Sequence, residues 1–492
     1  MVNISKHKQH NKLGKGAMKK SIWAVLLLSL FVFSCQKKSL EDYRQMIDQG
    51  KFSEASKEIK ERLKNDSSMS DSLRQNLLFE LERMKRIRKD FGQTEQDVLK
   101  FIKQYVPDVT PKDLLRWEKE KKLEYMVIDG KKMFFNQAAR NLFRLDKHLK
   151  KIWQQAHADE NKNKFDLDAH IKQVMKDCLT TNEPYSDPIR FRIHYSVTVL
   201  PDQVPAGDTI RCWLPFPREI PHRQINIKIR KTDPPKYILA PNSYLQRTIY
   251  FEKPSAGSDS TRFSVTYEYT SQGVYVDIDP QKVQPVNTNG PLRKYLRQRP
   301  PHIVFWDTLR VLSKKIVGNE TNPYRIAQKI FAWVDTNITW ASAREYSTIR
   351  HIGLYPVLTR HGDCGIQTLL FITLLRMNGI PARWESGWEF QPPHDSMHDW
   401  SMVYFKPYGW VPADVTYGMR QSNDPKLKFF YLNGMDSYRL IFNDDFGRKF
   451  YPPKKFFRSE TVDSQRGEVE WKGGNLYFDQ WKWNMDWEII SK

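Results

Sequence analysis

The pattern of hydrophobic and polar positions changes twice along the chain, and each change predicts a domain boundary. From about Ser39 to Cys178, apolar residues recur at the spacing of amphipathic helices, among many charged residues. Between residues 185 and 280, short runs of β-branched and aromatic residues alternate with Pro, Gly, Asn, Asp and Ser. From about residue 300 the two patterns mix. We therefore expect a multidomain protein with an α-helical N-terminal region, a β-sandwich and a C-terminal α+β domain.

Within the helical region, at residues 35–182, two helices precede a hairpin. Periodicity predicts helices over 95–105 and 112–121, and the second follows a Thr-Pro pair that suits a helix start. Alternating segments then flank Asp129-Gly130, a strong signal for a two-residue hairpin turn. Two helices and a hairpin resemble a small winged-helix unit. In a cytoplasmic protein such a unit would suggest DNA binding, whereas in an exported protein it indicates a packing or protein-contact module.

Five short runs predict the strands of an antiparallel β-sandwich at residues 185–280. They cover residues 189–200, 209–213, 224–231, 246–251 and 261–270.

The third part, a domain at residues 300–420, mixes helices and strands. Helices are predicted over 304–316 and 323–334. A third begins after the Gly362-Asp363 turn and ends at Asn378-Gly379, with a proline beyond. Residues 421–492 form an aromatic-rich extension, and we expect a strand near its end to return and cover the core.

Length and composition limit the number of domains and exclude some classes of protein. The 492 residues suit two to four domains, and 40% apolar residues supply enough material for packed cores. Wholesale disorder is therefore excluded. The 79 Lys and Arg outnumber the 57 Asp and Glu, giving a formal charge of +22, which first suggests nucleic acid or anionic membrane as a partner.

The first 34 residues change that interpretation. They carry six lysines and no acidic residue, and the apolar run Ile22–Phe33 is only 12 residues long. This is shorter than the ~20 residues of a membrane-spanning helix. A basic segment before a short apolar run is typical of an export signal. The run ends at Ser34-Cys35, which resembles the lipobox of bacterial lipoproteins, where Cys35 would be lipidated. The alternative is a plain secretory signal with a chance cysteine.

An exported protein meets little nucleic acid. Without the signal lysines, 73 basic residues still face 57 acidic ones, a formal charge of +16. Anionic lipids and cell-wall polymers surround such a protein, so the charge indicates a basic solvated surface in the cell envelope. We predict no nucleic-acid partner, and a membrane contact through the lipid anchor.

Three residues in the third domain suggest thiol chemistry. Cys364 falls in the first turn of its helix, where unpaired N–H groups and the helix dipole favour the thiolate. His398 lies on a predicted strand, and a tight turn leads to a second strand that ends at Asp414, so the two would lie side by side. The backbone N–H of Cys364 would serve as an oxyanion donor. A cysteine, a histidine and an aspartate in this order predict a nucleophile, a general base and the group that orients the base.

The motifs around these residues resemble the transglutaminase-like core, a papain-type thiol fold. The similar segments are Gly362-Asp363-Cys364, Gly379–Arg383, His398-Asp399-Trp400 and Gly409–Asp414. The resemblance covers residues 302–417 and implies that Cys364 is the nucleophile, His398 the general base and acid, and Asp414 the orienter. Members of this family perform acyl transfer on carboxamides, hydrolyse amide bonds or have lost activity. No cofactor is implied.

Other residues near the motifs are open to two interpretations. Trp340 follows the second helix where the family commonly carries an aromatic near the oxyanion site, although packing is the commoner fate of a tryptophan. His361 and His394 lie close in sequence but outside the strand motif. Cys364 lacks the companion Cys or His residues of a zinc site. Cys178 and Cys212 would form a disulfide in an oxidising compartment or remain two buried thiols.

These patterns together predict an exported, lipid-anchored thiol enzyme that acts on amide bonds of a protein, peptide or glycopeptide through a thioester. Hydrolysis is favoured over crosslinking because water is the default acceptor. The alternative is an inactive envelope protein that binds glycan or peptide on the same fold. A contact between the Cys364 sulfur and the His398 imidazole would favour the enzyme, and a wide separation would favour the binding protein.

Overall fold

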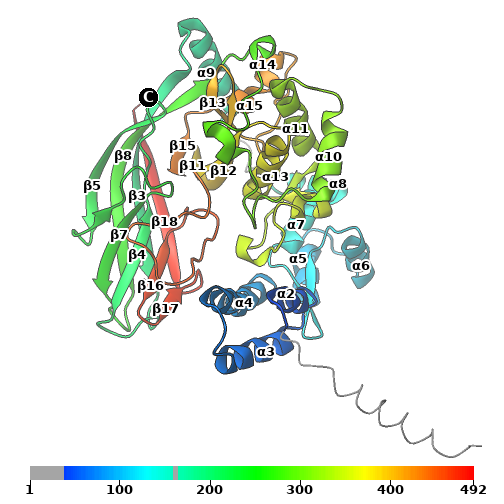
Figure 1. The fold of residues 1–492 in the computed structure, drawn as a ribbon, viewed down its shortest axis with the longest axis vertical. Coiled ribbons are helices and arrows are strands. Elements are labelled where there is room, and N and C mark those ends of the chain that lie inside the picture. Colours follow the sequence, from blue (N-terminus) through cyan, green and yellow to red (C-terminus); the bar gives the residue numbers. More distant parts are fainter. Residues whose placement is uncertain (1–37, 159–164, 492) are drawn as a thin grey trace, which may run out of the picture. The chain divides into compact units, whose positions relative to one another are not determined.

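The structure is a computed structural model that describes residues 38–158 and 165–491 (Figure 1). The predicted export signal and Cys35 lie outside the described residues. The chain divides into two compact units, and the boundary between them falls after Leu81.

Helices make up the described part of the first unit. It contains α2 (Leu40–Asp48), α3 (Phe52–Asn65) and the start of α4 (Asp71–Asp90), which continues into the second unit. A reciprocal pair of hydrogen bonds between Ser39 and Asp42 caps α2, and such a capping box satisfies backbone donors at the helix start. Apolar side chains of α2 and α3 are buried: Tyr43, Met46, Ile47, Phe52, Ala55 and Ile59.

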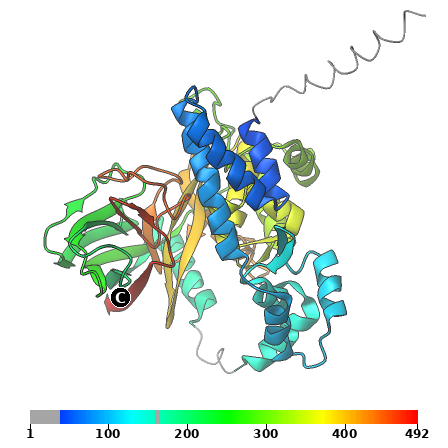
Figure 2. The same cartoon turned by 90° about the horizontal axis from the view of Figure 1, so that it is seen from below.

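The second unit begins with further helices and the predicted hairpin. In chain order they are α5 (Glu95–Lys103), α6 (Pro111–Lys119), β1 (Tyr125–Ile128), β2 (Lys131–Phe134), α7 (Ala138–Leu145) and α8 (Lys147–Ala156). The two predicted helices are confirmed, each with a Thr-Asp capping box, and so is the turn at Asp129-Gly130. Figure 2 shows α5, α7 and α8 as one group of cyan helices, in agreement with their contacts.

Two five-stranded sheets follow α9 (Leu167–Thr181). One sheet has the order β14-β8-β3-β18, with β5 also paired to β8, and the other has the order β17-β16-β4-β7-β6. Their strands are β3 (Tyr185–Val199), β4 (Thr209–Pro215), β5 (Gln224–Asp233), β6 (Ile238–Leu239), β7 (Thr248–Pro254), β8 (Thr261–Tyr275), β14 (Gly434–Met435), β16 (Glu468–Trp471), β17 (Gly474–Leu476) and β18 (Trp481–Ser491).

The two sheets use more of the chain than the predicted range of 185–280. Strand β18 pairs antiparallel with β3, and β16 pairs with β4, so the C-terminal extension completes both sheets. Figure 1 shows these red strands among the green ones. Buried side chains of both sheets form one hydrophobic cluster. Local sequence patterns locate strands but do not show which distant strands pair, which explains the difference.

The α+β part carries the residues predicted to be functional. Its helices are α10 (Asp307–Val317), α11 (Pro323–Asn337), α12 (Tyr355–Thr359), α13 (Cys364–Met377), α14 (Pro425–Lys428) and α15 (Phe430–Asn433), with short helical turns η2 (Pro280–Lys282), η3 (Pro291–Tyr295) and η4 (Tyr346–Thr348). Its strands are β9 (Thr339–Trp340), β10 (His361–Gly362), β11 (Ala382–Gln391), β12 (His394–Phe405), β13 (Gly409–Ala413) and β15 (Arg439–Asn443).

One antiparallel sheet and one buried helix form the centre of this part. The sheet order is β13-β12-β11-β15, and α13 contacts both β11 and β12. All residues of α13 from 365 to 376 are buried, including the polar residues Gln367, Thr368, Thr373 and Arg376. The sheet and the surrounding helices therefore fix the position of Cys364 at the first residue of α13.

Two further findings concern the cysteines outside the α+β part and the length of the apolar helices. Cys178 and Cys212 are both buried and free, so they form no disulfide in this structure. Among the described residues, no helix is both long enough and apolar enough to cross a membrane.

Candidate active site

Cys364 owes its position to a tight connection between β10 and α13. The Asp363 side chain accepts a hydrogen bond from the Ile366 backbone N–H at 3.1 Å, which caps the helix. Strand β10 pairs in parallel with β9, so Gly362 lies beside Trp340. The thiol therefore stands at the helix N-terminus, as the sequence predicted.

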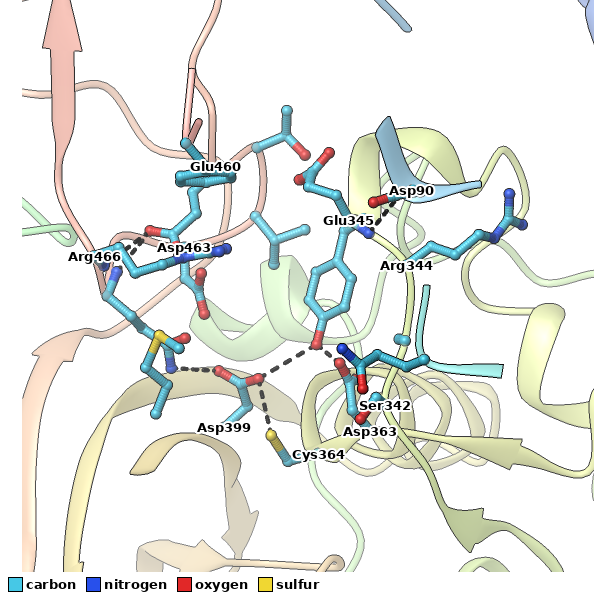
Figure 3. Close-up of a pocket in the computed structure, with 18 of the residues that line it drawn as sticks. Asp90, Ser342, Arg344, Glu345, Asp363, Cys364, Asp399, Glu460, Asp463 and Arg466 are labelled. Atoms are coloured by element: carbon cyan, nitrogen blue, oxygen red, sulfur yellow. Dashed lines mark hydrogen bonds and ion pairs between the residues drawn. The ribbon is translucent and has the colours of Figure 1, made fainter. Parts of the chain in front are cut away.

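The hydrogen-bond partner of the thiol is a carboxylate. Cys364 Sγ donates to Asp399 Oδ2 at 3.3 Å (Figure 3). The Tyr346 hydroxyl donates to Asp363 Oδ1 at 2.8 Å and also lies 3.5 Å from Asp399 Oδ2. A cysteine, two aspartates and a tyrosine thus form one connected group.

The electrostatics of this group oppose ionisation of the thiol. Burial, the Asp399 carboxylate and then the Asp363 carboxylate raise the pKa of Cys364 well above its usual value. The helix N-terminus alone predicts a lowered pKa. The two nearby carboxylates and the loss of solvent outweigh it, so that prediction is wrong.

Asp399 is held from two sides. Gln465 Nε2 donates to Asp399 Oδ1 at 2.9 Å, and Thr368 Oγ1 donates to the Asp399 backbone oxygen at 3.2 Å. Burial and the neighbouring Asp463 carboxyl raise the pKa of Asp399 well above its ordinary range. Burial and Glu460 raise the pKa of Asp463 to about 7. Both carboxyl groups therefore hold a proton more tightly than a solvent-exposed aspartate does.

His398 and Asp414 form the pair that the strand pattern predicted. His398 Nε2 lies 2.7 Å from Asp414 Oδ2, with both side chains buried. Arg439 lies 3.1 Å from Asp414, and Glu389 lies 3.8 Å from His398. Burial lowers the pKa of His398, but the Asp414 and Glu389 carboxylates outweigh it, so that this pKa is raised.

Within the described chain, Cys364 and His398 form no hydrogen bond with each other, contrary to the predicted triad geometry. The reason is the alternation of side chains along β12. Strand β12 pairs Ser386 with Asp399 and Gly387 with His398, so successive side chains point to opposite faces. Asp399 points to the face of Cys364, and His398 points to the face of Asp414.

Comparison with protein families agrees with the motifs. The model of the Transglutaminase-like superfamily matches residues 310–415, which include Cys364, His398 and Asp414. This chain contains a transglutaminase-like domain.

Comparison with individual proteins gives weaker likenesses. No curated protein matches the chain. A proposed cysteine protease from Cytophaga hutchinsonii is 16% identical, with a TM-score of 0.41, over 63% of this chain and 93% of that chain. The periplasmic domain of TgpA from Pseudomonas aeruginosa is 14% identical, with a TM-score of 0.25, over 50% of this chain and 91% of that chain.

A cavity of about 800 Å³ opens beside the thiol of the transglutaminase-like domain. Cys364, Asp399 and Trp340 line it, and Trp340 is 40% exposed with Arg144 over its ring. The other charged lining residues are Lys89, Asp90, Arg344, Glu345, Asp363, Glu460, Asp463, Arg466 and Asp479. Met397 and Asp399 line the cavity, whereas His398 between them lies on the opposite face of β12.

The other histidines near the site stay apart from the thiol. His361 is buried in β10 against the Tyr355 ring, and burial lowers its pKa. His394 is exposed at the start of β12. Neither lines the cavity among the described residues.

The sequence interpretation missed four residues at the thiol. Asp399 lies inside a recognised motif, and strand parity alone shows that it faces away from His398. Tyr346, Asp463 and Gln465 come from η4 and a C-terminal loop, and no local pattern connects them with Cys364.

Proposed function

We propose that this protein is a thiol enzyme that cleaves amide bonds, with Cys364 as the nucleophile. The transglutaminase-like domain supports this class of chemistry. The observation that carries the proposal is the Cys364 thiol, which lines a cavity of about 800 Å³ and donates a hydrogen bond to a buried carboxylate. A thiol that attacks a carbonyl needs a proton acceptor within hydrogen-bond reach, and Asp399 is in that position.

The roles that the family resemblance implies for His398 and Asp414 do not enter this proposal. The pair lies on the other face of β12 and is engaged by Arg439 and Glu389. Strand alternation directs the His398 side chain to the face opposite Asp399, the hydrogen-bond partner of Cys364.

Attack by Cys364 on a peptide or glycopeptide carbonyl gives a thioester and releases an amine. Water then resolves the thioester, since the cavity opens to solvent and water is the most abundant acceptor. Trp340, on the cavity wall, supplies an aromatic surface for the substrate chain. Cleavage is therefore favoured over crosslinking.

The test uses the full chain and a complex mixture of peptides and cell-wall glycopeptides. Products are identified by mass spectrometry for the native protein, Cys364→Ala and Cys178→Ala. Cys178 is a buried free thiol in α9 and serves as the matched control. New amine and carboxylate ends should appear with the native protein and the control but not with Cys364→Ala. Products that persist in Cys364→Ala would overturn the nucleophile assignment.

A parallel incubation with a fluorescent primary amine separates the two fates of the thioester. Hydrolysis predicts products that contain no amine label even when the amine is present. Stable incorporation of the amine at acyl sites would assign crosslinking instead.

A binding protein without catalysis is the second candidate, and one observation favours it. The pKa of the Cys364 thiol is raised, and the thiol has no imidazole partner among the described residues. Such a protein would bind a peptide or glycan in the cavity equally well before and after Cys364→Ala. Retained affinity in Cys364→Ala, with no turnover by the native protein, would establish this candidate.

We further propose that the protein is exported and anchored to the cell envelope through Cys35. The basic segment, the short apolar run and Ser34-Cys35 support this location. Metabolic labelling with an alkyne fatty acid should mark the full chain but not Cys35→Ala. Equal labelling of the native chain and Cys35→Ala would overturn the assignment of Cys35 as the lipidated residue.

A further inference from the structure

We propose that the cavity beside Cys364 selects a peptide or glycopeptide that carries a positively charged amino group close to the bond that is cleaved. The residue that we assign to this selection is Asp463, on the C-terminal loop of residues 444–467. This inference rests on the proposed function, because it names the class of substrate for the same site.

Acidic side chains dominate the lining of the cavity, although the whole chain has a formal charge of +22. The acidic lining residues are Asp90, Glu345, Asp363, Asp399, Glu460, Asp463 and Asp479. The basic lining residues are Lys89, Arg344 and Arg466. A concave site that concentrates one sign of charge attracts ligands of the opposite sign, so this lining favours a cation.

The basic residues do not neutralise this excess, because each already has an acidic partner. The pairs are Lys89 with Asp479, Arg466 with Glu460 at 2.6 Å, and Arg344 with Glu124 at 2.9 Å. Glu124 lies outside the cavity lining. No Lys or Arg of residues 38–158 and 165–491 forms an ion pair with the remaining aspartates, which are Asp90, Asp363, Asp399 and Asp463. The lining therefore has carboxyl groups without a cation.

Asp463 lacks a hydrogen-bond donor as well as a cation. It lines the cavity with only 4% of the residue exposed, and no described residue donates a hydrogen bond to its Oδ2. The two nearby arginines are engaged elsewhere: Arg458 donates to the Asp463 backbone oxygen, and Arg466 donates to Glu460. A buried carboxylate without donors is costly. A cationic donor on a ligand would supply what the protein does not.

A second carboxylate reaches the cavity from the helical region. Asp90 is the last residue of α4, and its Oδ2 accepts hydrogen bonds from the Glu345 backbone N–H at 3.1 Å and the Thr348 hydroxyl at 3.0 Å. Both donors are neutral, so they leave its charge uncompensated. Figure 3 shows Asp90 and Asp463 on different sides of the cavity. Residues far apart in the sequence therefore give the cavity acidic walls.

A protonated amino group fits this lining better than a metal ion does. An ammonium presents three hydrogen-bond donors and no acceptor, which suits an acceptor-rich surface. A metal ion needs several ligands around one point, and in the described ranges no three His, Cys, Asp or Glu residues are arranged to hold one. Met397 and Val462 also line the cavity and offer apolar surface to the aliphatic stem of a lysine-type side chain.

The protonation of Asp463 gives the selection a pH dependence. Burial and Glu460 raise the pKa of Asp463 to about 7. The charged and titratable groups that face it are Glu460, Arg458 and Arg466 on the C-terminal loop, Asp399 on β12 and Tyr346 on η4. An ammonium beside the carboxylate favours its charged form, so binding releases a proton. Affinity for a cationic peptide should therefore rise as the pH passes through this pKa.

The test measures peptide binding to the full chain with Cys364→Ala, which removes turnover. Three short peptides share one neutral sequence and carry a neutral fluorophore at the C-terminus. The first has an acetylated N-terminus and a central lysine, and the second has norleucine in place of the lysine. The third has norleucine and a free N-terminal amine. Fluorescence polarisation gives each Kd between about pH 5.5 and 8.5, a range in which lysine keeps its charge.

The lysine peptide should bind about tenfold more tightly than the acetylated norleucine peptide near neutral pH, as expected for one charge-assisted hydrogen bond. Its affinity should rise with pH, and that of the norleucine peptide should stay constant. A tenfold gain for the free N-terminal amine instead would also support a cation site and would assign it to a peptide N-terminus. Equal affinities for all three peptides, or no binding of any, would overturn the inference.

Asp463→Asn in the same background should abolish both the advantage of the lysine peptide and its rise with pH. Asp259→Asn, at an exposed position between β7 and β8, is the matched control and should keep both. An advantage that persists in Asp463→Asn would overturn the assignment of Asp463. Far-ultraviolet circular dichroism confirms folding of each variant. If Asp463→Asn unfolds, Asp90→Asn replaces it and should reduce the advantage of the lysine peptide.

The selection and the nucleophile assignment fail in different ways. Products that persist in Cys364→Ala would remove the nucleophile without changing the peptide affinities. Equal affinities for the lysine and norleucine peptides, together with cleavage that depends on Cys364, would remove the selection and leave the proposed function in place.

Discussion

His398 and Asp399 are consecutive residues of β12, and their side chains point to opposite faces of the sheet. On one face, His398 Nε2 lies 2.7 Å from Asp414 Oδ2. On the other face, Cys364 Sγ donates a hydrogen bond to Asp399 Oδ2 at 3.3 Å. A transglutaminase-like domain therefore presents its thiol to a carboxylate, while its histidine belongs to a buried ionic cluster.

Asp463→Asn should move the acid limb of the pH profile for amide cleavage to lower pH. The Asp463 carboxyl helps to raise the pKa of Asp399, so its removal lets Asp399 lose its proton at lower pH. The asparagine keeps the size of the side chain. The measurement is kcat/KM against pH for a peptide from the product screen. An acid limb at the native pH in this variant would show that Asp463 does not act on the catalytic proton.

Gly365→Ala tests whether the start of α13 requires a glycine, which lets the Tyr346 and Asp399 side chains approach the helix closely. A Cβ there would overlap the Tyr346 hydroxyl and crowd Asp399 Oδ2, so both side chains must move. We expect a loss of about 1 to 3 kcal/mol in the free energy of unfolding, as for other overpacked interiors. Chemical denaturation measures it. Gly290→Ala, whose Cβ would meet only ordinary contacts, is the control and should change little.

Local signals predicted much of the fold but not the partner of the thiol. The turn at Gly362-Asp363 and the apolar run after it fixed the start of α13, and strand parity correctly paired His398 with Asp414. The face of β12 on which α13 packs depends on the tertiary arrangement. Asp463 comes from a loop far along the chain, so no local pattern connects it with the thiol.

Local sequence patterns also do not show which distant strands pair in the two sheets. The composition of the segments between residues 185 and 275 predicted the strands that lie there. Their neighbours β16 and β18 lie more than 190 residues later in the sequence. Pairing over such a distance depends on the packed core rather than on either strand alone, which explains why the predicted sandwich was too short.

Buried carboxyl groups should make the protein less stable as the pH rises. Burial raises the pKa of Glu345 to about 7 and that of Asp90 to about 6. In the unfolded chain such groups titrate near ~4, so between ~4 and ~7 the unfolded state loses protons that the folded state keeps. Their contribution is complete below the unfolded pKa and disappears as the pH passes through the folded pKa.

Glu345→Gln should therefore flatten the dependence of the unfolding free energy on pH over that window. Urea denaturation at a series of pH values measures the slope. Glu183→Gln, at an exposed position between α9 and β3, is the control and should keep the native slope. A native slope in Glu345→Gln would assign the pH dependence to other groups.

Arg439→Met tests the buried cluster that holds the histidine. Arg439 is 2% exposed and lies 2.7 Å from Asp436, 3.1 Å from Asp414 and 3.3 Å from Glu389. Methionine fills similar space but leaves these carboxylates without a cation, which should cost about 3 to 5 kcal/mol in chemical denaturation. Arg420→Met breaks a more exposed ion pair and should cost at most about 1 kcal/mol. Equal losses in both variants would show that the cluster contributes no more to stability than a surface pair.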